Sequence, residues 1–261
     1  MPELPDLEVF KGNIFNRITS KRLTGLEVFN PKKVFVSQVT LAEELNGRSL
    51  LGINRAGKEL FFDFGDGKVI SAHLMLNGKI SIIDKANVDG IKYKIFAMHF
   101  EKESLVFSDM GGLCTIKYKP PVNKTPDAFD ETFTLEYFMN IIRKKPRMNI
   151  KAFLIDQSIV RGIGNAYVDE ILWVARISPH SITGKIPDDI LSSLYSAIGS
   201  VLKDAIESIK RISPDIISGE ERSFLKVHTK TKKQTETGHP IIAERLAGKI
   251  TYFTREQVLY A

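Results

Sequence analysis

The chain has 261 residues, 43% of them hydrophobic, which is enough for two domains with separate cores. Lysine and arginine exceed aspartate and glutamate by six, which favours a polyanionic partner but equally suits a basic protein that binds none. The single cysteine, Cys114, excludes an intrachain disulfide and a multi-cysteine metal site. With neither a secretory signal nor a long apolar stretch in the sequence, we expect a soluble intracellular protein that does not enter a membrane.

The first part of the chain predicts one helix followed by many strands. Apolar residues at positions 7, 10 and 14 share one helical face near the N-terminus. From about residue 23 to residue 118, short runs rich in Val, Ile and Phe are broken by the turn dipeptides Asp66-Gly67 and Asn77-Gly78. These runs predict antiparallel strands that fold into a two-layer sandwich.

A proline-rich connection separates this part from the rest of the chain. Residues 119–127 contain three prolines and almost nothing to bury, which is typical of an extended linker. We therefore expect one domain over residues 1–125 and a second over residues 126–261.

The second part has a helical period. It predicts a helix around residues 135–142, another around 168–175, and a long third helix that begins near Pro187 and runs to about Ile209. From about residue 224 to residue 261, short strand-like runs return around Gly238 and Gly248. This tail predicts a small β-hairpin at the end of the helical domain.

Residues 156–170, which read DQSIVRGIGNAYVDE, carry the strongest local signal. Gly162 and Gly164 permit the positive φ angles of a tight reversal between helices, and Asn165 can cap the helix that follows. The backbone amides of this turn would then lie at a helix N-terminus, where a phosphate binds well. A tight helical hairpin without any ligand accounts for the same residues.

This segment closely resembles the helix–two-turn–helix of formamidopyrimidine-DNA glycosylases. Their pattern runs Asp-Gln, a short apolar run, Gly-Ile-Gly-Asn, and then Tyr, Asp and Glu, all of which are present here. In that family the asparagine and the neighbouring turn, here Asn165 and Gly164, bind DNA phosphates around the damaged nucleotide. The N-terminal residues 1–5, MPELP, are similar to the N-terminus of the same family.

The chemistry of this N-terminus explains why the family needs these residues. Initiator methionine is usually removed ahead of a small residue, which would leave Pro2 with a secondary amine. Because α-amino groups titrate near about 7.7 to 8.0, a useful fraction is neutral and nucleophilic at cellular pH. The resemblance implies that Pro2 attacks the anomeric carbon and that Glu3 handles protons at the sugar ring. An extended terminus with a solvated glutamate is the alternative.

Two further segments of the first domain resemble the family. Lys58 falls where the family has a lysine at a β-turn that contacts phosphate near the lesion, although an ordinary hairpin lysine is the alternative. Residues 73–78, HLMLNG, resemble the family's His-Leu-Gly-Met-Ser-Gly loop. Leu76 aligns with the methionine that fills the gap left by a flipped nucleotide, and Met75 is adjacent. We therefore expect His73, Met75 and Leu76 to contact DNA.

The tail departs from the family, which usually ends in a zinc finger with two Cys-x-x-Cys pairs. The residues at the four cysteine positions are Gln234, Thr237, Thr254 and Gln257. We therefore expect a finger without zinc over about residues 224–261, held by the apolar packing of residues such as Ile241, Ile250, Tyr252 and Phe253. Lys249 stands where the family has an arginine that grips phosphate, so the charge remains but the bidentate fork is lost.

Other departures concern the base pocket. Residues 109–114 align with the family's Asp-Pro-Arg-Arg-Phe-Gly loop, so the gap-filling arginine and phenylalanine become Gly111 and Leu113. Residues 210–222 are shorter than the family's loop that closes over an oxidised purine, and lack its Gly-Gly-Thr-Thr opening. Asp6 replaces a family glutamate.

Taken together, the resemblance implies an α+β protein with an N-terminal two-layer antiparallel β-sandwich and flanking helices. The C-terminal part would be a helix–two-turn–helix domain that ends in a zincless β-hairpin finger. The implied function is DNA base-excision repair by a monomeric DNA glycosylase and abasic-site lyase, which uses no metal or cofactor. Its implied partner is double-stranded DNA with a damaged base or an abasic site. Its location would be the cytoplasm with the nucleoid, or the nucleus of a eukaryote.

The residues that the resemblance singles out fall into two groups. The catalytic group is Pro2, Glu3 and Lys58; the DNA-binding group is His73, Met75, Leu76, Gly164, Asn165 and Lys249. A protein that binds abasic or distorted DNA without chemistry is the main alternative, and it would have no reason to keep an amine and an acid at the terminus. Binding of structured RNA is a third hypothesis, but the sequence has no aromatic stacking motif for it.

Overall fold

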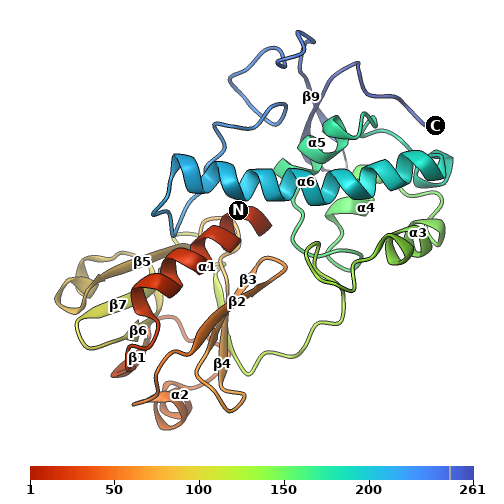
Figure 1. The fold of residues 1–261 in the computed structure, drawn as a ribbon. Helices are drawn as coiled ribbons and strands as arrows, with labels where there is room; N and C mark the ends of the chain where they lie inside the picture. The colour runs from red at the N-terminus through yellow and green to blue at the C-terminus, as the bar shows by residue number, and fades with distance from the viewer. Residues whose placement is uncertain (247) are drawn as a thin grey trace. The chain divides into compact units, whose positions relative to one another are not determined.

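The computed structural model describes residues 1–246 and 248–261, which form two compact units (Figure 1). The first unit contains Met1–Asn123 together with Ile209–Glu220, and the second contains Lys124–Ser208 together with Glu221–Ala261. The end of the long helix α6 and the loop after it thus belong to the first unit, although they follow the helices of the second unit in sequence.

Helix α1 (Leu4–Ile18) opens the first unit, as the apolar period predicts. Pro5 lies in its first turn, where no intrahelical amide bond is lost, and the Asp6 carboxylate accepts a hydrogen bond of 2.8 Å from the Glu3 N–H. Leu7, Phe10 and Ile14 are buried on one face of the helix. The N-terminal residues are therefore fixed to a helix that is anchored in the core.

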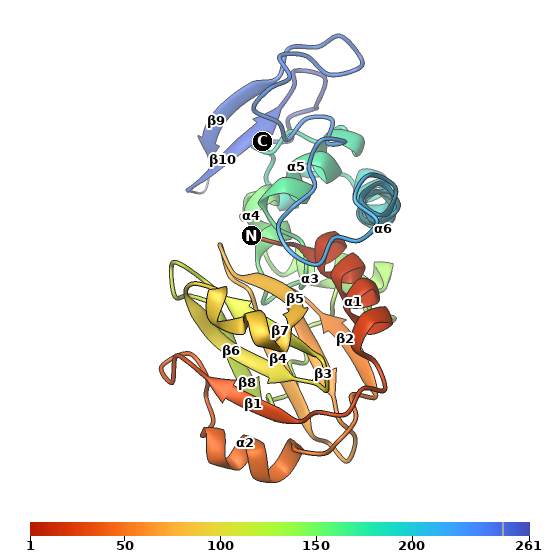
Figure 2. The ribbon, with the colours of Figure 1, turned by 90° about the vertical axis from the view of Figure 1, so that its left-hand side faces the viewer.

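Two four-stranded antiparallel sheets form the body of the first unit (Figure 2). One sheet has the order β1-β6-β7-β5, with β1 (Gly25–Val28), β5 (Lys79–Asp84), β6 (Lys94–His99) and β7 (Glu103–Ser108). The other has the order β2-β3-β4-β8, with β2 (Gly52–Ala56), β3 (Glu59–Asp63), β4 (Val69–His73) and β8 (Thr115–Tyr118). Phe62 of one sheet meets Phe107 of the other edge to face, with ring centroids 5.8 Å apart. The predicted two-layer sandwich is confirmed.

Two features of this unit differ from the sequence-based expectation. Helix α2 (Gln38–Leu45) lies where only strands were expected. Ser37 caps this helix. Of the residues described in α2, Leu41 and Leu45 are buried. So short an apolar stripe resembles a strand pattern. The Asn77-Gly78 pair joins β4 to β5, which belong to different sheets, rather than closing a hairpin. Gly78 donates to the Leu74 carbonyl at 2.9 Å, and an added Cβ would lie 2.2 Å from that oxygen.

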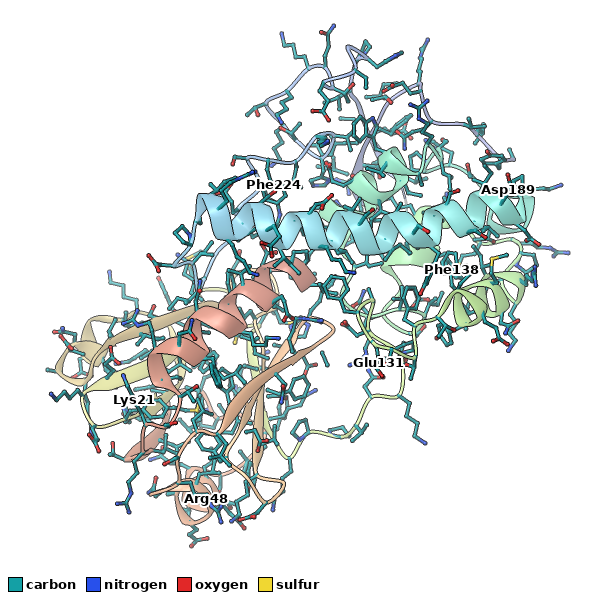
Figure 3. All side chains as sticks on the ribbon, in the orientation of Figure 1. Lys21, Arg48, Glu131, Phe138, Asp189 and Phe224 are labelled. Carbon is teal, nitrogen blue, oxygen red and sulfur yellow. The ribbon has the colours of Figure 1, made fainter. Side chains whose placement is uncertain are left out.

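The second unit is built on helices α3 (Leu135–Arg143), α4 (Ile150–Ile155), α5 (Asn165–Val174) and most of α6 (Asp188–Ile212). Short 3-10 segments, Lys85–Gly90 in the first unit and Thr183–Lys185 in the second, complete the helical elements that the structure describes. The short helix α4 was not predicted as a separate element. Phe138 of α3, labelled in Figure 3, packs against the rings of Phe133, Phe153 and Tyr195. This aromatic cluster joins α3, α4 and α6 into one core.

The chain ends in a β-hairpin of β9 (Ile242–Leu246) and β10 (Lys249–Phe253), which pair antiparallel. Figure 2 shows this hairpin beside α5 within the second unit. The predicted terminal hairpin is therefore confirmed. In the part of the chain that the structure describes, no helix has the length and apolar character needed to cross a membrane.

Candidate active site and nucleic-acid interface

Pro2 is buried and lines a cavity of about 640 Å³ in the first unit. The rest of the lining comes from residues 76–79, 92–93, 108–110 and 219–220, so five separate segments of the unit meet there. Of the residues predicted to act on the sugar or the base, the cavity brings Leu76 together with Pro2. The chain start thus faces a partly open cavity large enough for a nucleoside-sized group.

Glu3 follows Pro2 and is only 4% exposed. It has an extended backbone at the N-cap of α1, and its N–H donates to Asp6 at 2.8 Å. Asp6 is fully buried. The residue that replaces a family glutamate therefore fixes the backbone of the two N-terminal candidate catalytic residues.

Lys58 occupies the tight turn between β2 and β3, where Gly57 has a φ of 60°. The Lys58 side chain is 9% exposed. Its positive charge lies near His73, where it helps burial to lower the pKa of that imidazole, while Glu59 opposes the shift. The His73 Nδ1 accepts a hydrogen bond of 3.0 Å from the Met75 N–H, so the neutral ring carries its proton on Nε2. Lys58, His73 and Met75 therefore form one connected group.

The loop over residues 109–114 is held by one buried carboxylate. Asp109 accepts hydrogen bonds from the N–H groups of Gly111, Leu113 and Cys114, at 2.8, 2.6 and 2.8 Å. Met110 at the tip is 74% exposed and lines the cavity. The loop is therefore a rigid support for an exposed apolar side chain, with no guanidinium or aromatic ring at positions 111 and 113.

Cys114 closes the same loop in the core. Burial raises the pKa of its thiol to about 12, with help from the nearby Asp109 charge. The thiol is therefore protonated and unreactive at neutral pH, which leaves the chemistry of the cavity to other groups.

The turn between α4 and α5 differs in detail from the prediction. Gly164, not Asn165, is the N-cap of α5, so the expected capping role of Asn165 is wrong. Gly162 has a φ of 102°, but the backbone of Gly164 is extended. Gln157 fixes the turn by accepting from the Gly162 N–H at 3.0 Å and donating to the Ile155 and Ile163 carbonyls, each at 2.9 Å.

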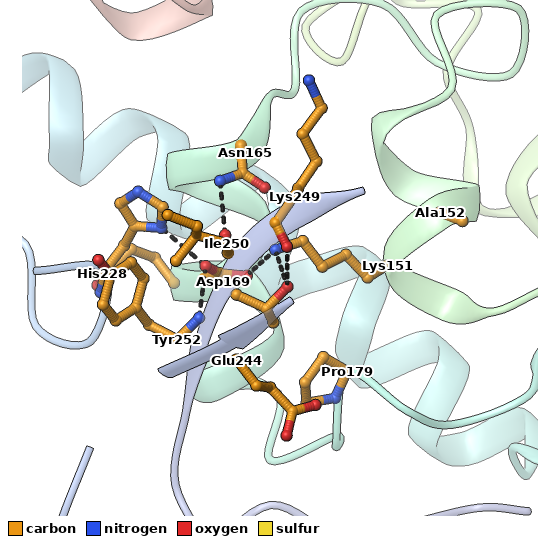
Figure 4. A network of polar contacts seen from close by, with 12 residues as sticks. Lys151, Ala152, Asn165, Asp169, Pro179, His228, Glu244, Lys249, Ile250 and Tyr252 are labelled. Carbon is orange, nitrogen blue, oxygen red and sulfur yellow. Dashed lines mark hydrogen bonds and ion pairs between the residues drawn. The ribbon is translucent and has the colours of Figure 1, made fainter. Parts of the chain in front are cut away.

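The side chain of Asn165 reaches across to the terminal hairpin. Its Nδ2 donates to the Ile250 carbonyl at 2.8 Å, which places it beside Lys249 (Figure 4). The Lys249 side chain is exposed. The structure therefore brings together the N-terminus of α5, an asparagine amide and a lysine, a combination that suits a phosphate group.

A buried polar network behind this surface was missed by sequence reasoning (Figure 4). The Asp169 carboxylate accepts from Lys151 Nζ at 2.7 Å and from the Tyr252 N–H at 3.0 Å, and it lies 2.7 Å from His228 Nδ1. Lys151, which is fully buried, also donates to Thr251 Oγ1 at 2.8 Å. Asp169 belongs to the Tyr-Asp-Glu end of the family pattern, so it could have been found; Lys151 and His228 gave no local signal.

Glu170, the next residue, holds the loop that leads to the hairpin. Its carboxylate accepts from the N–H groups of Lys226, Val227 and His228, at 3.0, 2.8 and 2.7 Å. Burial raises the pKa of the Glu170 carboxyl, and the three N–H donors oppose that shift. Asp169 and Glu170 together fasten the hairpin and its leading loop to α5.

Two of the four positions aligned with the family's zinc ligands are joined by hydrogen bonds to one glutamate. Thr237 Oγ1 and Thr254 Oγ1 donate to Glu256 Oε2 at 2.9 and 3.2 Å, and the Thr254 N–H donates to Gln257 at 2.8 Å. Among the described residues no group of three or more His, Cys, Asp or Glu side chains could hold a metal ion.

The expectation that apolar packing holds the hairpin is wrong in part. Ile250 is 46% exposed, whereas Tyr252 is 7% exposed. Buried hydrogen bonds to Lys151 and Asp169 join β10 to the helices in addition to the packing of Tyr252.

Comparison with known families defines the class of protein. The model of the formamidopyrimidine-DNA glycosylase N-terminal domain matches residues 1–116, and that of the formamidopyrimidine-DNA glycosylase H2TH domain matches residues 125–215. The two-sheet unit with a buried Pro-Glu start and the helical unit with a terminal hairpin thus place the chain in the helix–two-turn–helix class of DNA glycosylases.

Individual relatives agree with this class along the whole chain. The formamidopyrimidine-DNA glycosylase of Lactococcus lactis subsp. lactis strain IL1403 is 31% identical over 267 residues, with 97% of each chain covered. That of Carboxydothermus hydrogenoformans is 30% identical, covering 97% of this chain and 98% of the relative. A solved complex between the Lactococcus lactis Fpg and DNA containing an abasic site matches with a TM-score of 0.85 and 27% identity, over 97% of each chain. The chain belongs to the formamidopyrimidine-DNA glycosylase family.

Proposed function

We propose that this protein is a DNA base-excision repair enzyme that excises damaged bases and cleaves abasic sites through a Schiff base at Pro2. The observation that carries the proposal is the position of Pro2, which lines a cavity and is followed directly by the buried Glu3. Its substrate would be double-stranded DNA with a damaged base or an abasic site. Solved complexes of the related Lactococcus lactis protein with DNA containing an abasic site, Fapy-dG or an oxidised pyrimidine support this choice.

The proposed chemistry begins after removal of Met1. The neutral Pro2 nitrogen forms a bond to C1′ of the deoxyribose while the bond from C1′ to the base breaks, and the base leaves with that electron pair and with the N–H proton that the Pro2 nitrogen loses. Glu3 donates a proton to the ring oxygen as the ring opens, which leaves an iminium between Pro2 and C1′. The iminium acidifies the C2′ proton, whose loss expels the 3′ phosphate and cleaves the strand. At an abasic site the hydroxyl on C1′ leaves as water instead.

Two groups of residues would hold the DNA backbone in this proposal. Asn165, Gly164 and Lys249 form the phosphate site at the N-terminus of α5. Lys58 would bind a phosphate near the lesion, with His73 neutral beside it because burial lowers its pKa. These contacts carry no sequence information, so they suit an enzyme that finds lesions in any sequence.

We infer further that abasic sites are cleaved faster than 8-oxoguanine is excised. A flipped purine leaves a gap and an unpaired partner base, and Gly111 and Leu113 offer neither a guanidinium nor an aromatic ring to meet them. Leu76 and Met110, which are 56% and 74% exposed, can fill space but cannot donate hydrogen bonds to the partner base. Single-turnover rates on matched duplexes test this inference. Excision of 8-oxoguanine opposite cytosine as fast as abasic cleavage, with rejection of the adenine mispair, would contradict it.

The experiment that tests the catalytic proposal is borohydride trapping on duplexes with an abasic site, an oxidised purine or an oxidised pyrimidine. The wild type should give a covalent adduct, with Met1 absent by intact-mass analysis. A protein with one additional N-terminal residue that is not removed should lose the adduct by at least about 100-fold, because its Pro2 nitrogen is an amide. Fluorescence anisotropy should show that this extended control still binds abasic DNA.

The alternative, a protein that binds abasic or distorted DNA without chemistry, gives a different result in the same experiment. The wild type would then bind abasic duplexes and form no adduct. An adduct of equal yield in the extended protein would point to a nucleophile other than Pro2.

A further inference from the structure

A second carboxylate lies at the chain start. In the chain with Met1 in place, the terminal ammonium forms an ion pair with Oε1 of Glu220. Glu220 also lines the Pro2 cavity, and its side chain is 35% exposed. A carboxylate 219 residues along the chain therefore meets the amine of Met1, the residue directly before Pro2.

The loop that carries Glu220 is firmly attached to the first unit. Asn13 of α1 donates to the carbonyls of Pro214 and Ile216 at 2.7 and 2.8 Å. The Ile80 N–H of β5 donates to Ser218 Oγ at 3.1 Å. Ile216 and Ile217 pack against the core between the sheets. Although this loop is shorter than in the family, α1, β5 and the core all hold the residues that lead to Glu220.

Charged groups of both signs line the cavity. Among the described residues that line it, Asp109 and Glu220 carry carboxylates, and Asp109 is committed to three backbone N–H groups. Lys79 and Lys92 add positive charge, and Tyr93 a phenol. Glu3, which directly follows Pro2, is fixed at the N-cap of α1. The ion pair with the Met1 ammonium is made by Glu220.

We propose that, in the processed chain, Glu220 pairs with the Pro2 amine and acts as a positioning residue that sets the pH range of covalent attack. The inference rests on the proposed Schiff-base function. The ion pair holds the nitrogen inside the cavity in the resting enzyme. When the amine attacks C1′, its proton passes to the Glu220 carboxylate, and the nitrogen lone pair forms the new bond. Glu3 thus donates a proton to the sugar ring oxygen, and Glu220 accepts a proton from the Pro2 amine.

The test is the pH profile of adduct formation with an abasic duplex, trapped with cyanoborohydride between about pH 5 and pH 9. Glu220→Gln removes the negative charge with little change of shape. We expect the acid limb of its profile to move to lower pH by about 0.5 to 1 unit, a modest shift because the side chain is partly exposed. Relative to its own plateau, the variant should therefore form about 3 to 10 times more adduct on the acid limb. Its plateau rate should be lower than that of the wild type.

Two variants complete the design. Glu220→Asp keeps the charge and should retain the wild-type limb. Glu221→Gln is the matched control, because Glu221 accepts from the Ser223 N–H and does not line the cavity; its profile should match the wild type. If Glu220→Gln and the wild type both form the adduct and the acid limbs of their pH profiles coincide, the role of Glu220 is overturned and the Schiff-base proposal stands. A wild type that forms no adduct at any pH would overturn the Schiff-base proposal and this inference with it.

Discussion

The sheet unit and the terminal hairpin hold their functional residues by different physical means. In the first unit a continuous apolar core, which includes Phe10, Phe62 and Phe107, supports the helix that begins beside Pro2. The hairpin carries Lys249, a candidate for phosphate binding, and is joined to the helices by bonds to the buried Lys151 and Asp169. An apolar core loses stability gradually as atoms are removed. Removing one partner of a buried ion pair is strongly destabilising in a single step, because the other charge stays buried without compensation.

The difference follows from the size of the two regions. A two-stranded hairpin is at best marginally stable alone, and Ile250 of this one is 46% exposed. It therefore needs specific bonds to α5, which Asp169 and Glu170 supply. A finger can therefore keep its place through a few buried charged groups where the aligned cysteine positions carry Thr and Gln.

The largest effect should come from Lys151→Met, which leaves the fully buried Asp169 carboxylate without its ammonium partner. We expect the second unit to lose about 3–5 kcal/mol in its free energy of unfolding. Urea denaturation followed by the fluorescence of the single tryptophan, Trp173 in that unit, measures the loss.

Two further variants compare the apolar core of the first unit with the buried ion pair of the second. Phe62→Ala should cost the first unit a similar amount, about 3–5 kcal/mol, through a cavity in its core. Adding Asp169→Asn to Lys151→Met should recover part of the lost stability, since the unpaired charge is then gone. A Lys151→Met protein as stable as the wild type would show that the ion pair does not hold the hairpin.

The next effect concerns DNA binding. Lys249→Ala in the hairpin and Lys58→Ala in the sheet unit should each flatten the slope of log affinity against log salt by about 0.9, because each lost phosphate contact releases one counterion fewer. Both variants should weaken binding alike across DNA sequences. Anisotropy titrations from low to high salt measure the slopes, with the exposed Lys203→Ala as the control that should match the wild type. Unchanged slopes in both variants would mean that the two lysines are only solvated.

A smaller effect should appear in the pH dependence of the first unit. Burial lowers the pKa of His73 below its usual value of 6.5, so the unfolded chain takes up a proton before the folded chain does. The stability that depends on neutral His73 is therefore present above about pH 6.5 and is lost as the pH falls below it. His73→Asn keeps an acceptor for the Met75 N–H and should lose less stability between pH 7.5 and pH 5.5.

Melting temperatures at the two pH values measure this difference. Some acid sensitivity should persist in the variant, since burial also lowers the pKa of His99. His180→Asn in the second unit is the control. Identical acid sensitivity in His73→Asn and the wild type would contradict the assignment.

The smallest expected effect is a null result. Because Glu256 joins Thr237 and Thr254 at the positions of the family's cysteines, the hairpin should fold without metal. A strong chelator should leave the melting temperature unchanged, and elemental analysis should find no stoichiometric zinc. One zinc per chain would mean that the alignment of the tail is wrong.

By itself, the sequence determined those features of this protein that depend on local order. The apolar period of α1, the short apolar runs of β3 and β4, and the long stripe of α6 follow from residues within a few positions of one another. The Pro-Glu start and the Gly-Ile-Gly-Asn turn are also local, so family and candidate site could be predicted from them. The short helix α2 was not predicted, because two buried residues are too few to show a helical period.

Only the tertiary structure decided which distant side chains meet. Lys151 and His228 reach Asp169 across 18 and 59 residues, Asn165 reaches Ile250 across 85, and the terminal amine reaches Glu220 across 219. Such pairs leave no period in the sequence, because the contact depends on where the intervening elements pack rather than on neighbouring residues. Polar groups buried in this way are set by the need to satisfy each charge and donor once the fold has removed them from water.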